Sequence, residues 1–196
     1  MVDFTFKTKP YAHQLSALEA SCDSESFALL MDMGTGKSKV LIDTITYLDE
    51  KDLINSVLIF APKGVYKNWV EKEIPAHLPN EVKYKLAYWA SPLTNKHKDA
   101  IRSIWKVDDN LHIFVMNIEA LSSGKAEEVA TKFIKSHGGR TLIVIDESTV
   151  IKNHKARRTK AAIRLAKLCA YKRILTGSPI TKTPLDLFAQ FQFLGE

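Results

Sequence analysis

Short apolar runs alternate with longer segments of helical periodicity along most of the 196-residue chain. The apolar runs are dense in Val, Ile, Leu and Phe without strict alternation, which is typical of strands covered on both faces of a sheet. They predict strands at residues 27–31, 57–60, 112–116, 141–145 and 171–175, with a weaker one at 83–88. The segments between them predict helices at residues 11–21, 38–48, 65–73, 95–105, 125–135, 156–168 and 184–194. This order predicts an α/β fold with a doubly wound, mostly parallel sheet.

Large apolar side chains in two of the predicted helices are expected in the core. In the last helix, Leu185, Phe188, Phe191 and Leu194 recur every three residues, and we interpret them as core residues rather than a binding stripe. Trp69 is expected to be buried as well. No convincing linker interrupts the chain, so residues 1–196 are expected to form one domain.

Composition excludes several classes of protein. The chain is 45% hydrophobic and 26% charged, as in ordinary globular proteins and unlike disordered ones. No apolar stretch is long enough for a membrane helix, and the N-terminus has no secretion signal, so we expect no membrane partner. Cys22 and Cys169 lie far apart without a metal-ligand pattern and are expected to be reduced, partly buried thiols.

Positive charge is concentrated near the C-terminus. Lys and Arg number 28 against 22 acidic residues, which gives a net charge of +6. Residues 148–185 contain no acid, and the cations gather between Lys152 and Arg173. Such a block is either a solvated helix face or a surface that contacts phosphates, and composition alone leaves both open.

A glycine loop follows the first predicted strand. Asp32-Met33-Gly34-Thr35-Gly36-Lys37-Ser38 lies between that strand and a helix. Glycines allow backbone N–H groups to turn toward phosphate oxygens, and the helix N-terminus adds partial positive charge. We expect Lys37 to contact the β- and γ-phosphates and the Ser38 hydroxyl to bind Mg²⁺. The strict GxxxxGK[ST] pattern fails by one residue, because Met31 stands at the first glycine position.

An acidic pair ends a second apolar strand. Asp146 and Glu147 follow the buried run at residues 142–145. Because parallel strands of such a sheet bring their carboxyl ends to one edge, this pair is expected beside the glycine loop. We assign Asp146 to the metal ion and Glu147 to the attacking water.

Six segments in order then resemble the motifs of a known family, the first RecA-like lobe of superfamily 2 helicases, and within it the Swi/Snf-type DNA translocases. The resemblance runs from about Pro10 to Leu194. Its segments are Pro10-Tyr11-Ala12-His13-Gln14 (Q motif), Met33–Ser38 (motif I), Ile59–Lys63 with Asn68, Trp69 and Glu73 (Ia), Val115–Leu121 (Ib), Asp146–Thr149 with Ile151-Lys152-Asn153 (II) and Leu175–Ile180 (III).

The resemblance implies roles for further residues. Gln14 would read adenine through its amide, and Gly34, Thr35 and Gly36 would bind ATP together with Lys37 and Ser38. The residues near the DNA backbone would be Lys63, Asn117 and Lys152. The link between nucleotide site and DNA surface would be Thr176, Gly177 and Ser178.

The sequence is therefore identified as resembling the ATP-binding lobe of an enzyme that hydrolyses ATP to ADP and phosphate, with Mg²⁺, while moving along duplex DNA. The family needs a second RecA-like lobe bearing arginines, which we expect this chain to lack, so the lobe alone should be nearly inactive. A cytoplasmic or nuclear location is expected. The alternatives are a strand-separating helicase or restriction-type translocase, a non-catalytic DNA-binding module, and an unrelated P-loop kinase.

Overall fold

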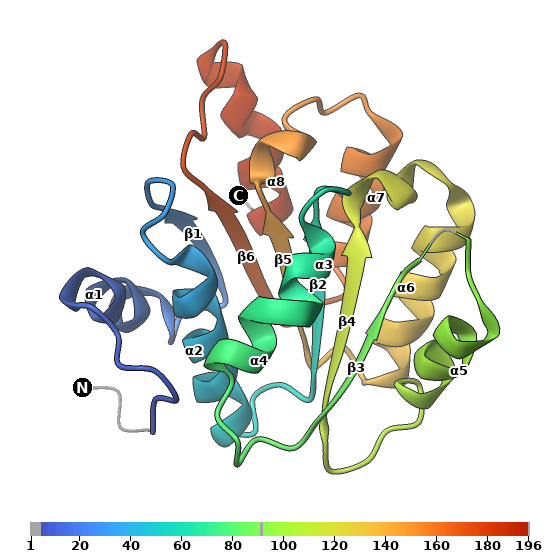
Figure 1. Cartoon of the computed structure of the whole chain (residues 1–196). Coiled ribbons are helices and arrows are strands. Elements are labelled where there is room, and N and C mark those ends of the chain that lie inside the picture. The colour runs from blue at the N-terminus through green and yellow to red at the C-terminus, as the bar shows by residue number, and fades with distance from the viewer. Residues whose placement is uncertain (1–4, 91, 196) are drawn as a thin grey trace.

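A single six-stranded parallel sheet forms the centre of the molecule in the computed structural model, which describes residues 5–90 and 92–195. The strand order is β1-β6-β5-β2-β4-β3 (Figure 1). The strands are β1 (Ser26–Leu30), β2 (Ser56–Ala61), β3 (Tyr84–Tyr88), β4 (Leu111–Asn117), β5 (Thr141–Asp146) and β6 (Tyr171–Thr176). The predicted fold class is confirmed, and each expected strand lies within two residues of its predicted bounds.

Helices cover both faces of the sheet (Figure 1). On one face pack α1 (Ala12–Ser21), α2 (Lys37–Glu50) and a continuous helical segment made of α3 (Tyr66–Asn68), the π-helical turn η1 (Trp69–Glu73) and α4 (Ile74–His77). On the other pack α5 (Asn95–Ser103), α6 (Gly124–Ser136), α7 (Arg157–Ala166) and α8 (Phe188–Leu194). Short 3-10 turns complete the chain as η2 (Ile118–Ser122), η3 (Ser148–Ile151) and η4 (Pro184–Leu187). Among the described residues, no helix is long and apolar enough to cross a membrane.

Alternate side chains of each central strand enter two separate cores. Along β5, Leu142 and Val144 belong to the core on the side of α1 and α2, whereas Ile143 and Ile145 belong to the core on the side of α6 and α7. This explains why the strand sequences do not alternate with polar residues, since both faces are covered. Cys22 and Cys169 are free thiols buried in these two cores, as expected.

The last strand is inserted between the two strands that carry the predicted chemistry. β6 pairs with β1 on one side, with Leu30 opposite Thr176, and with β5 on the other, with Asp146 opposite Leu175. Because all strands are parallel, the loops after β1, β5 and β6 meet at one edge of the sheet.

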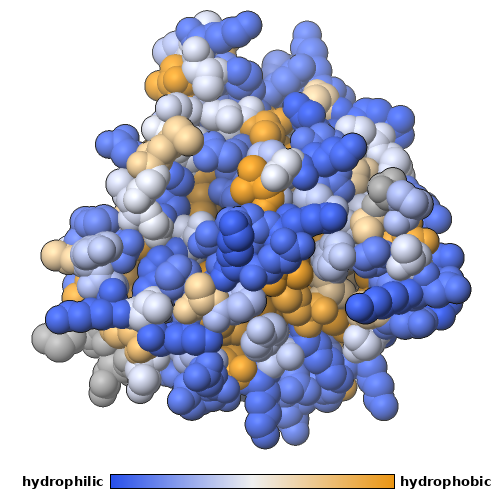
Figure 2. Space-filling model, in the orientation of Figure 1, coloured by the Kyte–Doolittle hydropathy of each residue, from blue (hydrophilic) through white to orange (hydrophobic). Residues whose placement is uncertain are grey.

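The prediction for the C-terminal helix was wrong for three of its four residues. Leu185 is 77% exposed and Phe188 is 57% exposed; Phe191 is also exposed, and only Leu194 is buried. Leu185 lies on the 3-10 turn η4, before α8 begins at Phe188. Within α8, with 3.6 residues per turn, Phe188 and Leu194 point about 120° apart rather than along one face. Hydrophobic atoms are correspondingly visible at the top of Figure 2, over the C-terminal segment.

The cationic block from Lys152 to Arg173 does not form one surface. Arg173 lies on β6 and is fully buried, where its guanidinium donates to the backbone carbonyl oxygens of Ser21 (2.8 Å) and Ser24 (2.7 Å). Burial lowers the pKa of Arg173 to about 10. Arg173 therefore ties the end of α1 to the sheet and contacts no phosphate, whereas Lys155, Arg157 and Lys160 are exposed.

Candidate active site

A cleft of about 480 Å³ opens at the edge of the sheet where β1 and β5 end. It brings together predicted residues from two motifs that are more than 100 positions apart in the sequence. The lining residues are Met33, Gly34, Gly36, Lys37, Ser38, Val65, Asn68, Glu73, Asp146 and Glu147. The glycine loop and the acidic pair thus face one space, as the sequence predicts.

The loop between β1 and α2 depends on two glycines. Gly34 has φ 77° and Gly36 has φ 83°, both in the left-handed region that side chains disfavour. The Thr35 hydroxyl donates to the Asp32 carbonyl oxygen at 2.7 Å and closes the turn. Gly36 is the N-cap of α2, so the free N–H groups of the helix begin at the loop.

Lys37 lies at the first position of α2 with its side chain folded along the loop. Its Nζ donates to the carbonyl oxygens of Met31 at 2.9 Å and Asp32 at 3.0 Å. An ammonium group has three donors, so one remains for a ligand oxygen. Ser38 is half-buried beside it in the cleft.

Asp146 is held by donors from two segments. Its Oδ1 accepts from the Glu147 backbone N–H at 3.0 Å, and its Oδ2 accepts from Trp69 Nε1 at 2.8 Å. Burial raises the pKa of Asp146, an effect that the Trp69 hydrogen bond opposes. Glu147 has φ 51°, an uncommon value for a residue with a side chain, which turns the chain sharply after β5.

The segment from α3 to α4 supplies cleft residues that the sequence analysis left without a role. Asn68 Nδ2 donates to Glu73 Oε1 at 3.0 Å, across the five-residue spacing of the π-helical turn. Trp69 is 1% exposed, which confirms its expected burial. Asn68 and Glu73 belong to the segment that resembles motif Ia, so the sequence marked both residues. The π-helical turn that brings them into contact cannot be recognised from hydrophobic periodicity.

Gln14 is buried behind the loop rather than in the cleft lining. Its Nε2 donates to the Thr35 carbonyl oxygen at 2.9 Å, and its Oε1 accepts from the Tyr11 backbone N–H at 3.0 Å. Exposed His13 also contacts the Thr35 carbonyl oxygen at 3.0 Å, and its ring stacks on that of Tyr11. The structure therefore places residues 11–14, from the segment that resembles the Q motif (the Q-like segment), directly against the glycine loop.

The loop after β6 contacts the glycine loop directly and is linked through α8 to the residue that follows the acidic pair. Thr176 is buried and its hydroxyl accepts from the Ser178 backbone N–H at 3.2 Å, while Gly177 packs against Met33 of the glycine loop. Farther along, Gln190 of α8 bonds to Ser148, directly after the acidic pair, and to the Pro179 carbonyl oxygen.

The three residues expected near DNA lie outside the cleft in two places. Lys63 and Asn117 meet at Glu119, whose carboxylate accepts from the Lys63 backbone N–H at 3.1 Å and from Asn117 Nδ2 at 3.4 Å. Lys152 instead donates to the Thr181 hydroxyl at 2.5 Å, in the loop after β6. Asp186 accepts hydrogen bonds from Thr181 and Lys182 in that loop, and these bonds lower the pKa of Asp186 to about 2.

The donor set of the cleft fits a magnesium ion bound with a nucleotide. The described residues contain no group of three or more His, Cys, Asp or Glu placed to hold a metal. Mg²⁺ in nucleotide sites takes one or two protein oxygens and completes its shell with phosphate oxygens and water. The Ser38 hydroxyl and the Asp146 carboxylate are hard oxygen donors of this kind.

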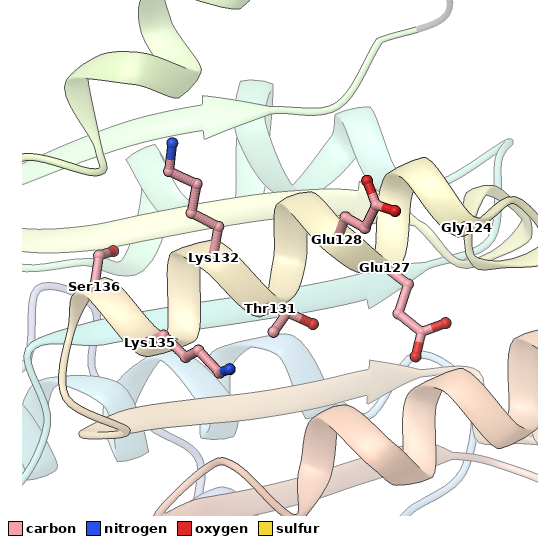
Figure 3. Close-up of a pocket in the computed structure, with 7 residues that line it drawn as sticks. All are labelled: Gly124, Glu127, Glu128, Thr131, Lys132, Lys135 and Ser136. Carbon is pink, nitrogen blue, oxygen red and sulfur yellow. The ribbon is translucent and has the colours of Figure 1, made fainter.

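A second hollow runs along the outer face of α6. In Figure 3, Glu128 and Lys132 point to one side of this helix, whereas Glu127, Thr131 and Lys135 point to the other. Since no polar groups converge there, the cleft beside the glycine loop is the better candidate.

Comparison with protein families agrees with this geometry. The model of the SNF2-related domain matches residues 13–196, which includes the glycine loop, the acidic pair and the loop after β6. The chain belongs to the SNF2-related domain family. The resemblance to Swi/Snf-type proteins is thereby confirmed.

Curated relatives of this SNF2-related domain are much longer proteins. It is 27% identical over 171 residues to the chromatin-remodeling ATPase INO80 of Cryptococcus neoformans, covering 83% of this chain and 9% of the relative. With the protein of the same name from Schizosaccharomyces pombe it shares 28% identity over 174 residues, covering 83% of this chain and 10% of the relative. The chain thus spans about a tenth of these relatives.

Solved structures share the fold of the SNF2-related domain. The Sulfolobus solfataricus SWI2/SNF2 ATPase core in complex with dsDNA matches with a TM-score of 0.72 and 22% identity, over 97% of this chain and 36% of that one. The UvsW helicase from bacteriophage T4 matches with a TM-score of 0.66 and 13% identity, over 95% of this chain and 58% of that one. At these identities the likeness concerns the fold alone.

Proposed function

We propose that this chain is the ATP-binding lobe of a DNA-dependent ATPase that moves along duplex DNA. The observation that carries the proposal is the cleft in which Lys37 and Ser38, at the start of α2, face Asp146 and Glu147, at the end of β5. Family membership and the names of the ATPase relatives support the same reading.

The glycine loop and the acidic pair would divide the roles that phosphoryl transfer to water requires. The loop around Gly34, Thr35 and Gly36 would bind the phosphates through backbone N–H groups, with Lys37 at the β- and γ-phosphates. Ser38 and Asp146 would hold Mg²⁺, which when bound neutralises charge on the phosphate oxygens. Glu147 would orient the attacking water and accept its proton.

Gln14 would act on the adenine side of the site. Both of its amide atoms already bond within the protein, to the backbone at Tyr11 and Thr35. Its carbonyl oxygen has a second lone pair and its NH₂ a second hydrogen, so contact with the base edge does not require these bonds to break. The amide would then connect base recognition to the phosphate loop.

DNA would lie over the edge that carries Lys63, Asn117 and Lys152, with Thr176, Gly177 and Ser178 connecting it to the nucleotide. The second RecA-like lobe would close the cleft from the opposite side. A strand-separating helicase and a restriction-type translocase would use the same lobe, and they differ by whether hydrolysis unwinds a duplex. A non-catalytic module is disfavoured because Lys37, Ser38, Asp146 and Glu147 all line one cleft.

Nucleotide binding is the direct test. Mg·ADP at about 100 times its Kd should stabilise the wild-type chain by roughly 2.7 kcal/mol, seen as a raised melting temperature. Lys37→Ala should remove the shift, whereas Lys135→Ala, on the outer face of α6, should retain it. An absent wild-type shift at millimolar nucleotide, or an equal shift in Lys37→Ala, contradicts the proposal.

A further inference from the structure

The hydrogen bond between Trp69 and Asp146 connects two segments that are 77 positions apart in the sequence. We propose that Trp69 is a positioning residue, which fixes the orientation of the carboxylate that would hold the metal ion. The inference rests on the proposed function, because it assigns a purpose to a side chain that touches neither nucleotide nor DNA in that proposal.

Two donors hold the Asp146 carboxylate, one on each oxygen. The Glu147 N–H reaches Oδ1 at 3.0 Å and Trp69 Nε1 reaches Oδ2 at 2.8 Å. The terminal torsion of an aspartate is broad and has little preference of its own. Rotation of this carboxylate would break one or both bonds, so the remaining lone pairs keep a fixed direction.

The indole suits this task better than other polar side chains. Its N–H only donates, whereas a hydroxyl or an amide can rotate and present an acceptor instead. The ring is among the largest fully buried side chains and packs in the core between α2 and the sheet. A buried indole N–H requires an acceptor, and Asp146 supplies it.

The local backbone also points to a functional purpose. Trp69 begins the π-helical turn η1, and π turns occur frequently at functional sites. The same turn carries Glu73, which with Asn68 lines the cleft. One short segment therefore contributes both to the wall of the cleft and to the support of Asp146.

The consequence is measurable as metal-dependent nucleotide affinity. Groups that orient a metal ligand typically change metal affinity by 10–100-fold when they are removed. Trp69→Phe keeps most of the ring and removes the N–H. It should raise the Kd for ADP measured in excess Mg²⁺ by about 10–100-fold. The Kd measured in EDTA, which reports the phosphate loop alone, should not change.

Trp105→Phe is the matched control. Trp105 Nε1 has no hydrogen-bond partner in the described part of the chain, and its ring lies under Lys132 on the other face of the sheet. This variant should match the wild type in both titrations. Equal affinities of Trp69→Phe and wild type in Mg²⁺, or equal losses of Trp69→Phe in Mg²⁺ and in EDTA, overturn the inference. A wild type that binds ADP no better with Mg²⁺ overturns the proposed function itself.

A second measurement covers the case in which Trp69→Phe does not fold. The chain has three tryptophans, so Trp89→Phe combined with Trp105→Phe leaves Trp69 as the only tryptophan, whose emission can be excited selectively over that of tyrosine. Adding Mg²⁺ to this variant with ADP bound should change the emission of Trp69, because its acceptor then also binds the ion. Asp146→Asn should abolish the change. Emission that does not respond to Mg²⁺ overturns the inference.

Discussion

Gly36 is the residue at which the glycine loop, α2 and the Q-like segment meet. Its φ of 83° excludes most side chains, and a Cβ there would overlap Gln14 Nε2. Gln14 in turn donates to the Thr35 carbonyl oxygen. A side chain at residue 36 would therefore displace the amide that holds the loop, as well as strain the backbone.

Gly36→Ala should lower the free energy of unfolding by about 1–3 kcal/mol and weaken ADP binding. Gly124→Ala is the control, since a Cβ at residue 124 meets no atom and that position needs no left-handed backbone. It should change stability by less than about 0.5 kcal/mol. Chemical denaturation and ADP titration measure both effects. Similar stabilities of the two variants would contradict this account of the loop.

Arg173 shows that a cation in a basic block can be structural. Arg173→Met removes donors from four buried or partly buried carbonyl oxygens, those of Ser21, Ser24, Glu25 and Lys172. The free energy of unfolding should fall by about 3 kcal/mol or more, measured by chemical denaturation. Lys172→Met, at the neighbouring half-exposed position, should have little effect. A loss of DNA affinity by folded Arg173→Met, without loss of stability, would contradict its structural role.

At the scale of elements, a buried histidine pair joins β4 to α6 at the edge of the sheet opposite the cleft. His137 Nδ1 donates to the Phe133 carbonyl oxygen at 2.8 Å, and its Nε2 faces His112 Nδ1 at 3.0 Å. His112 also contacts Asp108, which pairs with Lys85. Burial lowers the pKa of His137, with the nearby His112 ring acting in the same direction.

The sign of the resulting pH dependence follows from the pKa of His137, which is lower in the folded chain than the 6.5 expected after unfolding. At this residue the unfolded chain therefore binds more protons, so the contribution of His137 to the free energy of unfolding should fall as the pH drops from 7 to 5. Between pH 7 and 5, His137→Gln should therefore lose less free energy of unfolding than the wild type does, or gain more. Asp43, whose pKa burial raises to about 6, adds the opposite slope to both proteins and cancels in the comparison. Identical slopes would exclude a contribution from His137.

The sequence predicted those elements and site residues whose signals are local. The glycine loop and the pair Asp146-Glu147 are contiguous, and each follows a dense apolar run, so their position at one edge follows from a parallel sheet. The bonds from Gln14 to Thr35 and from Trp69 to Asp146 join distant segments, and only packing reveals them. The predicted burial of the apolar residues at 185–194 was wrong because a three-residue period was interpreted as one face of a continuous α-helix.

At the scale of the whole molecule, lysines lie at both edges of the sheet. Half-buried Lys152 lies at the edge that carries the cleft, whereas exposed Lys167 follows α7 and precedes β6 at the opposite edge. Binding to duplex DNA through phosphates should weaken as salt rises, with little sequence preference.

Lys63→Ala and Lys152→Ala should each lower affinity and reduce the salt slope by about 1, as expected for one lost phosphate contact. Lys167→Ala should leave both unchanged. Fluorescence anisotropy of a labelled duplex at several salt concentrations measures the slopes. An affinity independent of salt, or an equal loss in Lys167→Ala, would contradict a DNA surface at the edge of the cleft.

The single lobe should bind nucleotide and turn it over near the background rate. Lys37, Ser38, Asp146 and Glu147 all come from this lobe, and an arginine supplied by a second lobe is worth roughly 10³–10⁵ in rate in enzymes of this kind. Adding a second RecA-like lobe should restore DNA-stimulated hydrolysis, and Glu147→Gln should then abolish turnover without releasing ATP. Robust, DNA-stimulated hydrolysis by the monomeric chain, lost in Lys37→Ala, would refute this.

The insertion of β6 between β1 and β5 also constrains the order of events during folding. β1 and β5, which carry the glycine loop and the acidic pair, do not pair with each other; each pairs with β6, so residues 171–176 are needed to join them. Closing the contact between β1 and β6 brings together the first and last strands of the sheet, which is entropically costly and slow. We therefore expect a chain emerging from the ribosome to assemble the proposed nucleotide site only after β6 has been synthesised.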